Sequence, residues 1–312
     1  MRILQLDHNH TLITEQLSQH GFQVEEDYIS SYEQVLQKIH LYDGIIIRSR
    51  IPIDLPFLQQ AKNLKFIGRV GAGMENIDVP AADQLGIKLF HAPEGNRDSV
   101  AEHVLGMLLL LMHRLKISSN EVKNGIWLRE ENRGDELMGK TVGLIGYGNM
   151  GKAVAKRLSS FGCNVIFHDI LPDLSDEFSS QVSLEELKQN AHIISLHIPL
   201  TADTHYLVNR SFIDSVAKPF YFVNTSRGKN VLTKDLVEGI KSGKIRGAAL
   251  DVLEYETSSF EKIEESNPDL LFLLNSEKAL VTPHIAGWTH QSKQKLAQVI
   301  VDKIVKEYPS VL

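Results

Sequence analysis

The sequence has few cysteines, no cluster of metal ligands and no apolar N-terminus, and each of these absences excludes a class of protein. Its 312 residues include a single cysteine, Cys163, which cannot form a disulfide within the chain and suits a reducing compartment. No cysteines and histidines cluster at the spacing of a metal site, so we expect no bound metal. The first ten residues, MRILQLDHNH, carry one aspartate and two histidines where a secretory signal needs an apolar core. We therefore expect a cytoplasmic protein.

Long apolar runs and an excess of positive charge are also missing. The most apolar run, VLGMLLLLM at 104–112, has nine residues, about half the length that spans a bilayer. The formal net charge of −6 argues against a nucleic acid or an anionic membrane as a partner. The apolar content of 43% is enough for two ordinary domains with cores of their own.

Apolar stretches alternate with helical ones in the first third of the chain. We expect strands at 2–6, 22–24, 44–48, 65–69 and 87–90, and helices that include 11–19 and 31–40. This alternation predicts a parallel sheet wrapped by helices. Because it is complete near residue 92, this part is expected to form a domain of its own.

The next segment has a different character. Residues 99–115 are apolar on nearly every side, which predicts a helix enclosed between domains rather than one lying on a surface. Residues 116–137 follow, with Trp127 among many charges, and we expect an irregular arm. A solvated loop and a subunit interface both explain an exposed tryptophan there, and both interpretations stay open.

A glycine-rich turn between a strand and a helix is the most informative motif. The apolar strand at 142–145 is followed by the pattern GxGxxG, a dinucleotide-binding fingerprint made by Gly146, Gly148 and Gly151. The first glycine allows the tight turn, the second lets the backbone approach a pyrophosphate, and the third lets the next helix pack on the strand. That helix, at 150–161, would direct its positive end at the pyrophosphate.

An acidic residue follows at the position that reads the ribose. A second strand, at 164–168, ends at Asp169, 18 residues after the last glycine of the fingerprint. A carboxylate there would accept hydrogen bonds from the adenosine ribose. No arginine follows at 170–172 to bind the 2′-phosphate of NADP. The pattern therefore favours NAD over NADP.

The alternation of strands and helices resumes after Asp169. We expect strands at 191–198, 221–225, 246–252 and 278–284, and helices from 183, at 233–241 and at 289–308. These elements complete a doubly wound sheet around the nucleotide site. The last helix comes after that sheet is finished, and its amphipathic face allows a return to the first domain.

Ligands of open α/β sheets bind beyond the carboxyl ends of the strands, so the residues there decide the chemistry. These residues are Arg48, Arg50, Gly71, Gly73, Arg227, Asp251 and His284. Arginines, glycines and one histidine in a cleft that also holds a nucleotide predict a site where a small anion is oxidised or reduced.

Two of these side chains suit that reaction. Arg227 offers a fork of donors that matches a carboxylate and can polarise the adjoining carbonyl. A histidine titrates near neutral pH, so His284 can give or take the hydroxyl proton as hydride moves. A carboxylate beside the imidazole would orient it, and the local sequence leaves Glu254 and Glu256 as candidates.

Four motifs in order along the chain carry a family resemblance. They are GYGNMG at 146–151, NTSRG at 224–228, ALDVLEYE at 249–256 and TPHIAGWT at 282–289. Together they resemble the NAD-dependent D-isomer-specific 2-hydroxyacid dehydrogenases over nearly the whole chain. The resemblance implies an α/β fold of two doubly wound parallel-sheet domains. A flavodoxin-like substrate domain would comprise 1–98 plus 288–312, and an inserted Rossmann NAD-binding domain 99–287.

The resemblance also assigns residues by position. It implies a catalytic set of Arg227, Glu256 and His284, with Glu256 preferred to Glu254 because the family's acid is the third residue after the tripeptide at 251–253. The residues implied for the cofactor NAD are Gly146, Gly148, Asn149, Met150, Gly151, Asp169, Ile170, His197, Pro199, Thr204, Thr225, Ser226, Asp251 and Gly287. Those implied for the substrate are Arg48, Ser49, Arg50, Gly71, Ala72 and Gly73.

Within the family, three stretches resemble the D-3-phosphoglycerate dehydrogenase branch most. They are IIIRSR at 45–50, IGRVGAGMENID at 67–78 and WLREENRGDELMGKTVG at 127–143. This resemblance implies interconversion of 3-phosphoglycerate and 3-phosphohydroxypyruvate, with Arg48, Arg50 and Arg129 as cations for the phosphate. Arg129 lies in the arm that in such relatives reaches across a homodimer.

Two features depart from that pattern. Thr257 stands where relatives have a proline after the glutamate, so the resemblance does not imply the path of the loop that follows. The chain ends at Leu312 without a C-terminal regulatory domain, and serine feedback through such a domain is not expected. Two alternative functions stay open: a hydroxypyruvate or glyoxylate reductase, and an NAD-sensing corepressor or scaffold on the same fold.

Overall fold

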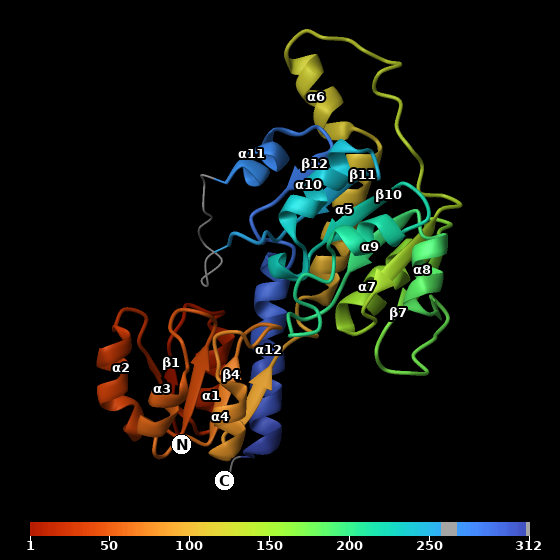
Figure 1. The fold of residues 1–312 in the computed structure, drawn as a ribbon. Helices are drawn as coiled ribbons and strands as arrows, with labels where there is room; N and C mark the ends of the chain where they lie inside the picture. The colour runs from red at the N-terminus through yellow and green to blue at the C-terminus, as the bar shows by residue number, and fades with distance from the viewer. Residues whose placement is uncertain (257–266, 310–312) are drawn as a thin grey trace. The chain divides into compact units, whose positions relative to one another are not determined.

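The computed structural model describes residues 1–256 and 267–309 (Figure 1). The chain divides into two compact units. Unit 1 consists of Met1–Arg97 with Trp288–Leu312, and unit 2 of Asp98–Gly287. The loop that departs from the family pattern at Thr257 lies outside the described residues.

Unit 1 contains a five-stranded parallel sheet with the strand order β2-β1-β3-β4-β5. Its strands are β1 (Arg2–Gln5), β2 (Gln23–Glu26), β3 (Gly44–Ile47), β4 (Phe66–Arg69) and β5 (Lys88–His91). Each lies close to its predicted position, and the order is the flavodoxin-like one. The fold predicted for this part of the chain is confirmed.

Helices cover both faces of this sheet (Figure 1). One face is covered by α2 (Tyr32–Lys38), the short 3₁₀ helix η1 (Ile39–Leu41), α3 (Leu55–Gln60) and α4 (Val79–Gln84). The other is covered by α1 (Leu12–Gln19) and α12 (His290–Glu307). Successive residues of a strand face opposite ways, so Ile45 and Ile47 pack under the first group and Ile46 under the second.

Unit 2 contains a seven-stranded parallel sheet with the strand order β12-β11-β10-β9-β6-β7-β8. Its strands are β6 (Thr141–Ile145), β7 (Asn164–His168), β8 (Ser180–Gln181), β9 (Ile193–Leu196), β10 (Phe220–Asn224), β11 (Ile245–Leu250) and β12 (Ala279–Val281). The chain runs outward from β6 through β7 and β8, then returns to β9 and runs outward in the opposite direction. The carboxyl ends of β6 and β9 therefore flank the switch point at which such sheets bind ligands.

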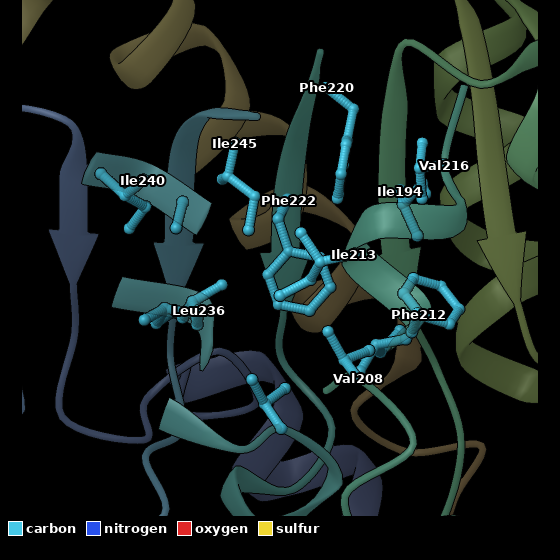
Figure 2. Packing of buried hydrophobic residues seen from close by; sticks show 14 of the residues in the cluster. Ile194, Val208, Phe212, Ile213, Val216, Phe220, Phe222, Leu236, Ile240 and Ile245 are labelled. Carbon is cyan, nitrogen blue, oxygen red and sulfur yellow. The ribbon is translucent and has the colours of Figure 1, made fainter. Parts of the chain in front are cut away.

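Helices also cover both faces of the second sheet. One face carries α8 (Leu184–Asn190), α9 (Arg210–Ser215), α10 (Thr233–Lys241) and α11 (Pro268–Asn275), and the other carries α5 (Arg97–Met112) and α7 (Asn149–Ser159). Figure 2 shows buried side chains of α9, α10 and β10 in this core, among them Phe212, Leu236 and Phe222. This doubly wound sheet confirms the predicted Rossmann-type architecture.

The apolar run at 104–112 forms part of α5. Its Val104, Met107, Leu108 and Met112 side chains are buried in the core of unit 2. Neither α5 nor any other helix within the described ranges combines the length and the apolar character that a membrane crossing needs.

The prediction of an irregular arm after α5 is wrong for its first part. A further helix, α6 (Leu115–Lys123), follows Arg114, whose backbone is left-handed with φ of 54°. The stretch contains neither proline nor glycine before Gly125, so its many charges do not prevent a helix. Irregular structure begins only beyond α6, where Trp127 is 77% exposed.

Candidate active site

The glycine fingerprint forms a tight turn at the switch point of unit 2. Gly146 has φ of +94°, and a Cβ added there would lie 2.4 Å from the carbonyl oxygen of His197, at the end of β9. A Cβ added to Gly151 would lie 2.2 Å from the carbonyl oxygen of Gly146. Gly148 faces open space instead. Two glycines thus let backbone segments touch, and the third leaves room beside the start of α7 for a ligand.

The chain around this turn fits a dinucleotide. α7 begins at Asn149 without a side-chain cap, so its first amide groups can donate to a pyrophosphate. At the end of β7, Asp169 accepts hydrogen bonds from the amides of Tyr147, at 2.7 Å, and Leu171, at 3.0 Å. Each carboxylate oxygen retains a further acceptor position for a ribose hydroxyl. Ile170, which follows, is 92% exposed.

The loops after β9 and β10 supply the next predicted cofactor residues. Ser226 donates from its hydroxyl to the carbonyl of Leu196 at 2.6 Å, which ties these two strand ends together. The Oγ1 atom of Thr225 is buried and has no hydrogen-bond partner among the described residues. Burial lowers the pKa of His197 to about 4, so its imidazole is neutral at pH 7. His197 is therefore unsuited to proton transfer at that pH.

Asn230 is a residue that the sequence predictions missed. It is fully buried in η2 (Gly228–Asn230), and its Nδ2 donates to the carbonyls of Pro199 at 3.3 Å and Thr204 at 3.1 Å. It thereby joins the loop after β10 to the loop after β9. An asparagine followed by the apolar pair VL was the available signal, because a buried amide needs partners.

Arg227 follows β10, and the next residue, Gly228, lies directly against the turn after β11. A Cβ added to Gly228 would lie 1.9 Å from the carbonyl oxygen of Leu253. The Nη1 atom of Arg227 donates to the carbonyl of Ser226 at 2.7 Å. The close approach brings the arginine's loop to the turn that carries Glu256.

The structure brings two members of the predicted catalytic set together. Nδ1 of His284 lies 2.8 Å from Oε2 of Glu256. A carboxylate only accepts, so Nδ1 of His284 donates this bond. Oε1 of Glu256 accepts from the amide of Leu253, which fixes the carboxylate. The side chains are 25% and 14% exposed, so water screens the pair only partly.

The alternative acid, Glu254, is engaged elsewhere. Its Oε1 accepts a hydrogen bond from the hydroxyl of Tyr206 at 2.6 Å, and its Oε2 accepts from the amide of Thr233 at 2.9 Å. The bond to Glu254, with burial, raises the pKa of Tyr206 to about 12. Glu254 therefore caps the start of α10 and holds Tyr206, while Glu256 contacts the histidine.

Asp251 holds the backbone around His284. It is 1% exposed, and its carboxylate accepts from the Thr282 hydroxyl at 2.6 Å and from the amides of Ile285 at 2.9 Å and Ala286 at 2.7 Å. Burial acts to raise the pKa of Asp251, but hydrogen bonds from His103, Thr282 and these amides outweigh it and hold the pKa below its ordinary value. This contact set adds a structural role to the cofactor role implied by the sequence.

The predicted substrate residues lie in unit 1, after β3 and β4. The guanidinium of Arg50 donates to three carbonyls: that of Leu6 at 2.5 Å, of Ser30 at 2.5 Å and of Asp27 at 3.0 Å. Each of its three nitrogens therefore already contacts the backbone. The Arg48 guanidinium lies over the ring of Trp288, 4.3 Å from its centroid.

The remaining substrate residues follow β3 and β4 as predicted. Ser49 stands between the two arginines, and Gly71, Ala72 and Gly73 follow β4. The carbonyl of Ala72 contacts Nδ1 of His91 at 2.8 Å. The predicted catalytic set belongs to unit 2 and these residues to unit 1, so a shared cleft stays a prediction. Across the part of the chain that the structure covers, no group of potential ligand side chains is placed to hold a metal ion.

Comparison with known proteins agrees with the geometry of unit 2. A family model described as "D-isomer specific 2-hydroxyacid dehydrogenase, NAD binding domain" matches residues 105–286. That range contains the glycine fingerprint, Arg227 and the Glu256–His284 pair. The cofactor of this unit is NAD.

Relatives extend along the whole chain. The D-3-phosphoglycerate dehydrogenase of Archaeoglobus fulgidus is 35% identical over 294 residues, 93% of this chain and 54% of that protein. The hydroxypyruvate reductase of Thermotoga maritima is 34% identical over 275 residues, 88% of each chain. The crystal structure of D-lactate dehydrogenase from Aquifex aeolicus, complexed with NAD and lactic acid, superposes with a TM-score of 0.85 at 28% identity. It covers 99% of this chain and 95% of that one.

The lengths of these relatives differ. This chain spans about half the length of the Archaeoglobus D-3-phosphoglycerate dehydrogenase, but most of the length of the hydroxypyruvate reductase. Similarity through both units and the matched NAD-binding domain show that the chain belongs to the D-isomer specific 2-hydroxyacid dehydrogenase family.

Proposed function

We propose that this chain catalyses NAD-dependent interconversion of a D-2-hydroxy acid and its 2-keto acid. The observation that carries the proposal is the contact between Glu256 and Nδ1 of His284, in the same unit as the glycine fingerprint. An imidazole oriented by a carboxylate is a general acid and base suited to neutral pH.

Three side chains take part in the proposed reaction. The Arg227 guanidinium binds the substrate carboxylate and polarises the adjoining keto group. In the reducing direction, Nε2 of His284 gives its proton to the keto oxygen, and in the oxidising direction it takes the proton from the hydroxyl. Glu256 stabilises the imidazolium before the proton is given and after it is taken. NADH, when bound, supplies the hydride.

For the substrate we propose the pair 3-phosphoglycerate and 3-phosphohydroxypyruvate. The similarity to the Archaeoglobus D-3-phosphoglycerate dehydrogenase supports this choice. Arg48 is the cation at the end of β3 whose guanidinium lies over the ring of Trp288. Arg48→Ala should therefore raise the KM for phosphohydroxypyruvate more than the KM for hydroxypyruvate.

The contacts of Arg50 favour a second candidate, a hydroxypyruvate or glyoxylate reductase. Three backbone carbonyls already occupy the nitrogens of this guanidinium, which weakens its assignment to a phosphate. The hydroxypyruvate reductase of Thermotoga maritima also matches this chain over a larger share of its own length.

A substrate panel tests both candidates. Purified protein is incubated with NADH and, in turn, phosphohydroxypyruvate, hydroxypyruvate, glyoxylate and pyruvate, and the loss of NADH absorbance is followed. The first candidate requires the highest kcat/KM on phosphohydroxypyruvate, and the second requires it on one of the unphosphorylated acids. Absence of turnover on all four would leave the NAD-sensing scaffold as the better interpretation.

We also propose a homodimer formed through α6 and the arm that follows it. Leu115, Val122, Ile126 and Trp127 are apolar and between 45% and 77% exposed on this segment. Apolar side chains gathered on one exposed segment suit a subunit interface. Light scattering should give twice the mass of the chain, and Trp127→Glu should shift the protein towards the monomer.

A further inference from the structure

Two side chains on one face of α5 contact the loop that carries His284. This loop, Thr282–Ala286, is named the His284 loop below. The Ser99 hydroxyl donates to the carbonyl of Ala286 at 2.7 Å. Nε2 of His103 lies 3.1 Å from the Thr282 hydroxyl and 3.5 Å from Oδ1 of Asp251. Residues four apart in a helix share a face, so α5 contacts both ends of the loop.

The direction of each hydrogen bond follows from the atoms. Thr282 has one hydroxyl proton, and it donates that proton to Asp251 at 2.6 Å. Towards His103 the hydroxyl can therefore only accept, so Nε2 of His103 carries a proton. The result is a directed chain from His103 through Thr282 to Asp251, which also accepts from the amides of Ile285 and Ala286.

The burial of this network raises the cost of disturbing it. Asp251 is 1% exposed, Ser99 is 7% exposed and the His103 side chain is 22% exposed. A buried carboxylate needs all of its donors, because water cannot replace one that is removed. Loss of the His103 donor would weaken the hold of Asp251 on the loop amides.

The contacts with Asp251 stabilise an unfavourable backbone conformation in the His284 loop. His284 has φ of +56°, a left-handed backbone conformation that residues other than glycine adopt at a cost in free energy. Its amide donates to the carbonyl of Asp251 at 2.8 Å, and the next two amides donate to the Asp251 carboxylate.

We propose that Ser99 and His103 are positioning residues, which hold the His284 loop through Thr282 and Asp251 so that the imidazole of His284 meets Glu256. Neither residue is part of the predicted site. The inference about the loop stands on its contacts alone, whereas its consequence for catalysis rests on the proposed function.

The first test measures the loop directly. Amide hydrogen exchange is compared between wild type, His103→Leu and His103→Gln, because glutamine can place an N–H near the position of Nε2. In His103→Leu, exchange at Ile285 and Ala286 should rise about tenfold or more, while β6 keeps its protection. His103→Gln should restore most of the protection. Equal protection in wild type and His103→Leu would overturn the proposal.

The second test measures turnover. Displacing His284 from Glu256 should lower kcat for keto-acid reduction in His103→Leu by about ten- to a hundredfold, with the affinity for NADH nearly unchanged. Ser99→Ala should act in the same direction with a smaller effect, and His103→Gln should recover most of the rate. An unchanged kcat in His103→Leu, or a glutamine variant as slow as the leucine variant, would contradict the positioning role.

The matched control is His113→Leu. His113→Leu changes an exposed histidine just after the end of α5 and should leave both exchange and kcat at wild-type values. If wild type turns over no 2-keto acid, the proposed function fails, and the exchange experiment still decides whether His103 holds the loop.

Discussion

The carboxyl edges of the two sheets differ in what their charged residues contact. In unit 2, Glu256 lies against His284, so an acid and a base stand in contact at the strand ends. In unit 1, Arg50 also follows a strand, but its guanidinium is bound to three carbonyls of its own unit. A charged side chain at the strand ends thus meets another ionisable side chain in one unit and backbone carbonyls in the other.

Ligands of open α/β sheets bind beyond the carboxyl ends of the strands, and this difference shows what that rule predicts and what it does not. The rule gives the place of a functional residue, because parallel strands end at one edge. It does not give the partner that the side chain meets there. The role of each charge follows from that partner, as Glu254 and Glu256 show with one residue between them.

Removing the base from unit 2 should have the largest effect. We expect His284→Ala to lower kcat for keto-acid reduction by roughly two to four orders of magnitude, the usual contribution of general acid–base catalysis. The measurement is steady-state turnover of NADH with the best substrate of the panel. His40→Ala, which changes an exposed histidine of unit 1, serves as the control. A loss below tenfold would assign the proton transfer to another group.

Neutralising the acid should change the pH range of the reaction. In Glu256→Gln the imidazolium loses the carboxylate at 2.8 Å, so the upper pH limit of reduction should fall. The profile of kcat against pH measures this limit.

Glu254→Gln is the matched control for that experiment. It should lower stability through Tyr206 and the start of α10 while the pH limit stays in place. A shifted limit in Glu254→Gln and an unshifted one in Glu256→Gln would reverse the assignment of the two acids.

Arg50→Ala tests the other side of the comparison. Loss of three hydrogen bonds from a charged group should lower the free energy of unfolding by about 2 to 4 kcal/mol. Any rise in KM should be equal for phosphohydroxypyruvate and hydroxypyruvate, because the change acts through the backbone. A rise confined to the phosphorylated substrate, with unchanged stability, would show that Arg50 binds the phosphate as the sequence implied.

Much of the fold could be predicted because its signals are local and periodic. The apolar strands and the glycine turn at Gly146 fall where the sequence placed them. The many charges around α6 favour irregular structure in a reading of the sequence, yet a helix forms because no proline or glycine interrupts it.

The contacts within the site could be predicted only in part. The strand-end position indicated His284, and the family resemblance preferred Glu256 to Glu254. The structure brings these two side chains, Glu256 and His284, together. Asn230 and Arg50 donate hydrogen bonds to backbone carbonyls of segments that are far from them in the sequence. No local sequence pattern marks such pairs. The partners of a polar side chain depend on tertiary packing.

A smaller effect, on the choice between NADH and NADPH, is expected when Asp169 at the end of β7 is changed. Asp169 should repel the 2′-phosphate of NADP, so Asp169→Asn, which keeps the shape and removes the charge, should reduce the preference for NADH over NADPH by about tenfold. The measurement is the ratio of kcat/KM for the two cofactors. Asp173→Asn, close in the sequence, provides a control. A wild-type enzyme that uses NADPH better than NADH would refute the role given to this carboxylate.

The smallest expected effect is a difference in how the stability of the two units changes as the pH falls. Burial lowers the pKa of His197 in unit 2 from 6.5 to about 4, so the unfolded chain binds this proton more readily than the folded one. The stability that neutral His197 contributes is complete above pH 6.5 and is lost as the pH falls towards 4. In unit 1, hydrogen bonds with Lys38 and Ser30 outweigh burial and hold the pKa of Asp27 below its ordinary 3.8. Its contribution therefore declines only below about pH 3.8.

Unit 2 should consequently weaken first on acidification. Between pH 6.5 and 4 its free energy of unfolding should fall by less than about 1.4 kcal/mol per pH unit, because His197 keeps part of its surface exposed. Native-state hydrogen exchange of β6 and β9 against that of β1 and β3 measures the two units separately. His197→Gln should remove most of the slope in unit 2 and none in unit 1. Equal slopes in both units, or a slope in unit 2 that survives the substitution, would mean that other groups govern its response to acid.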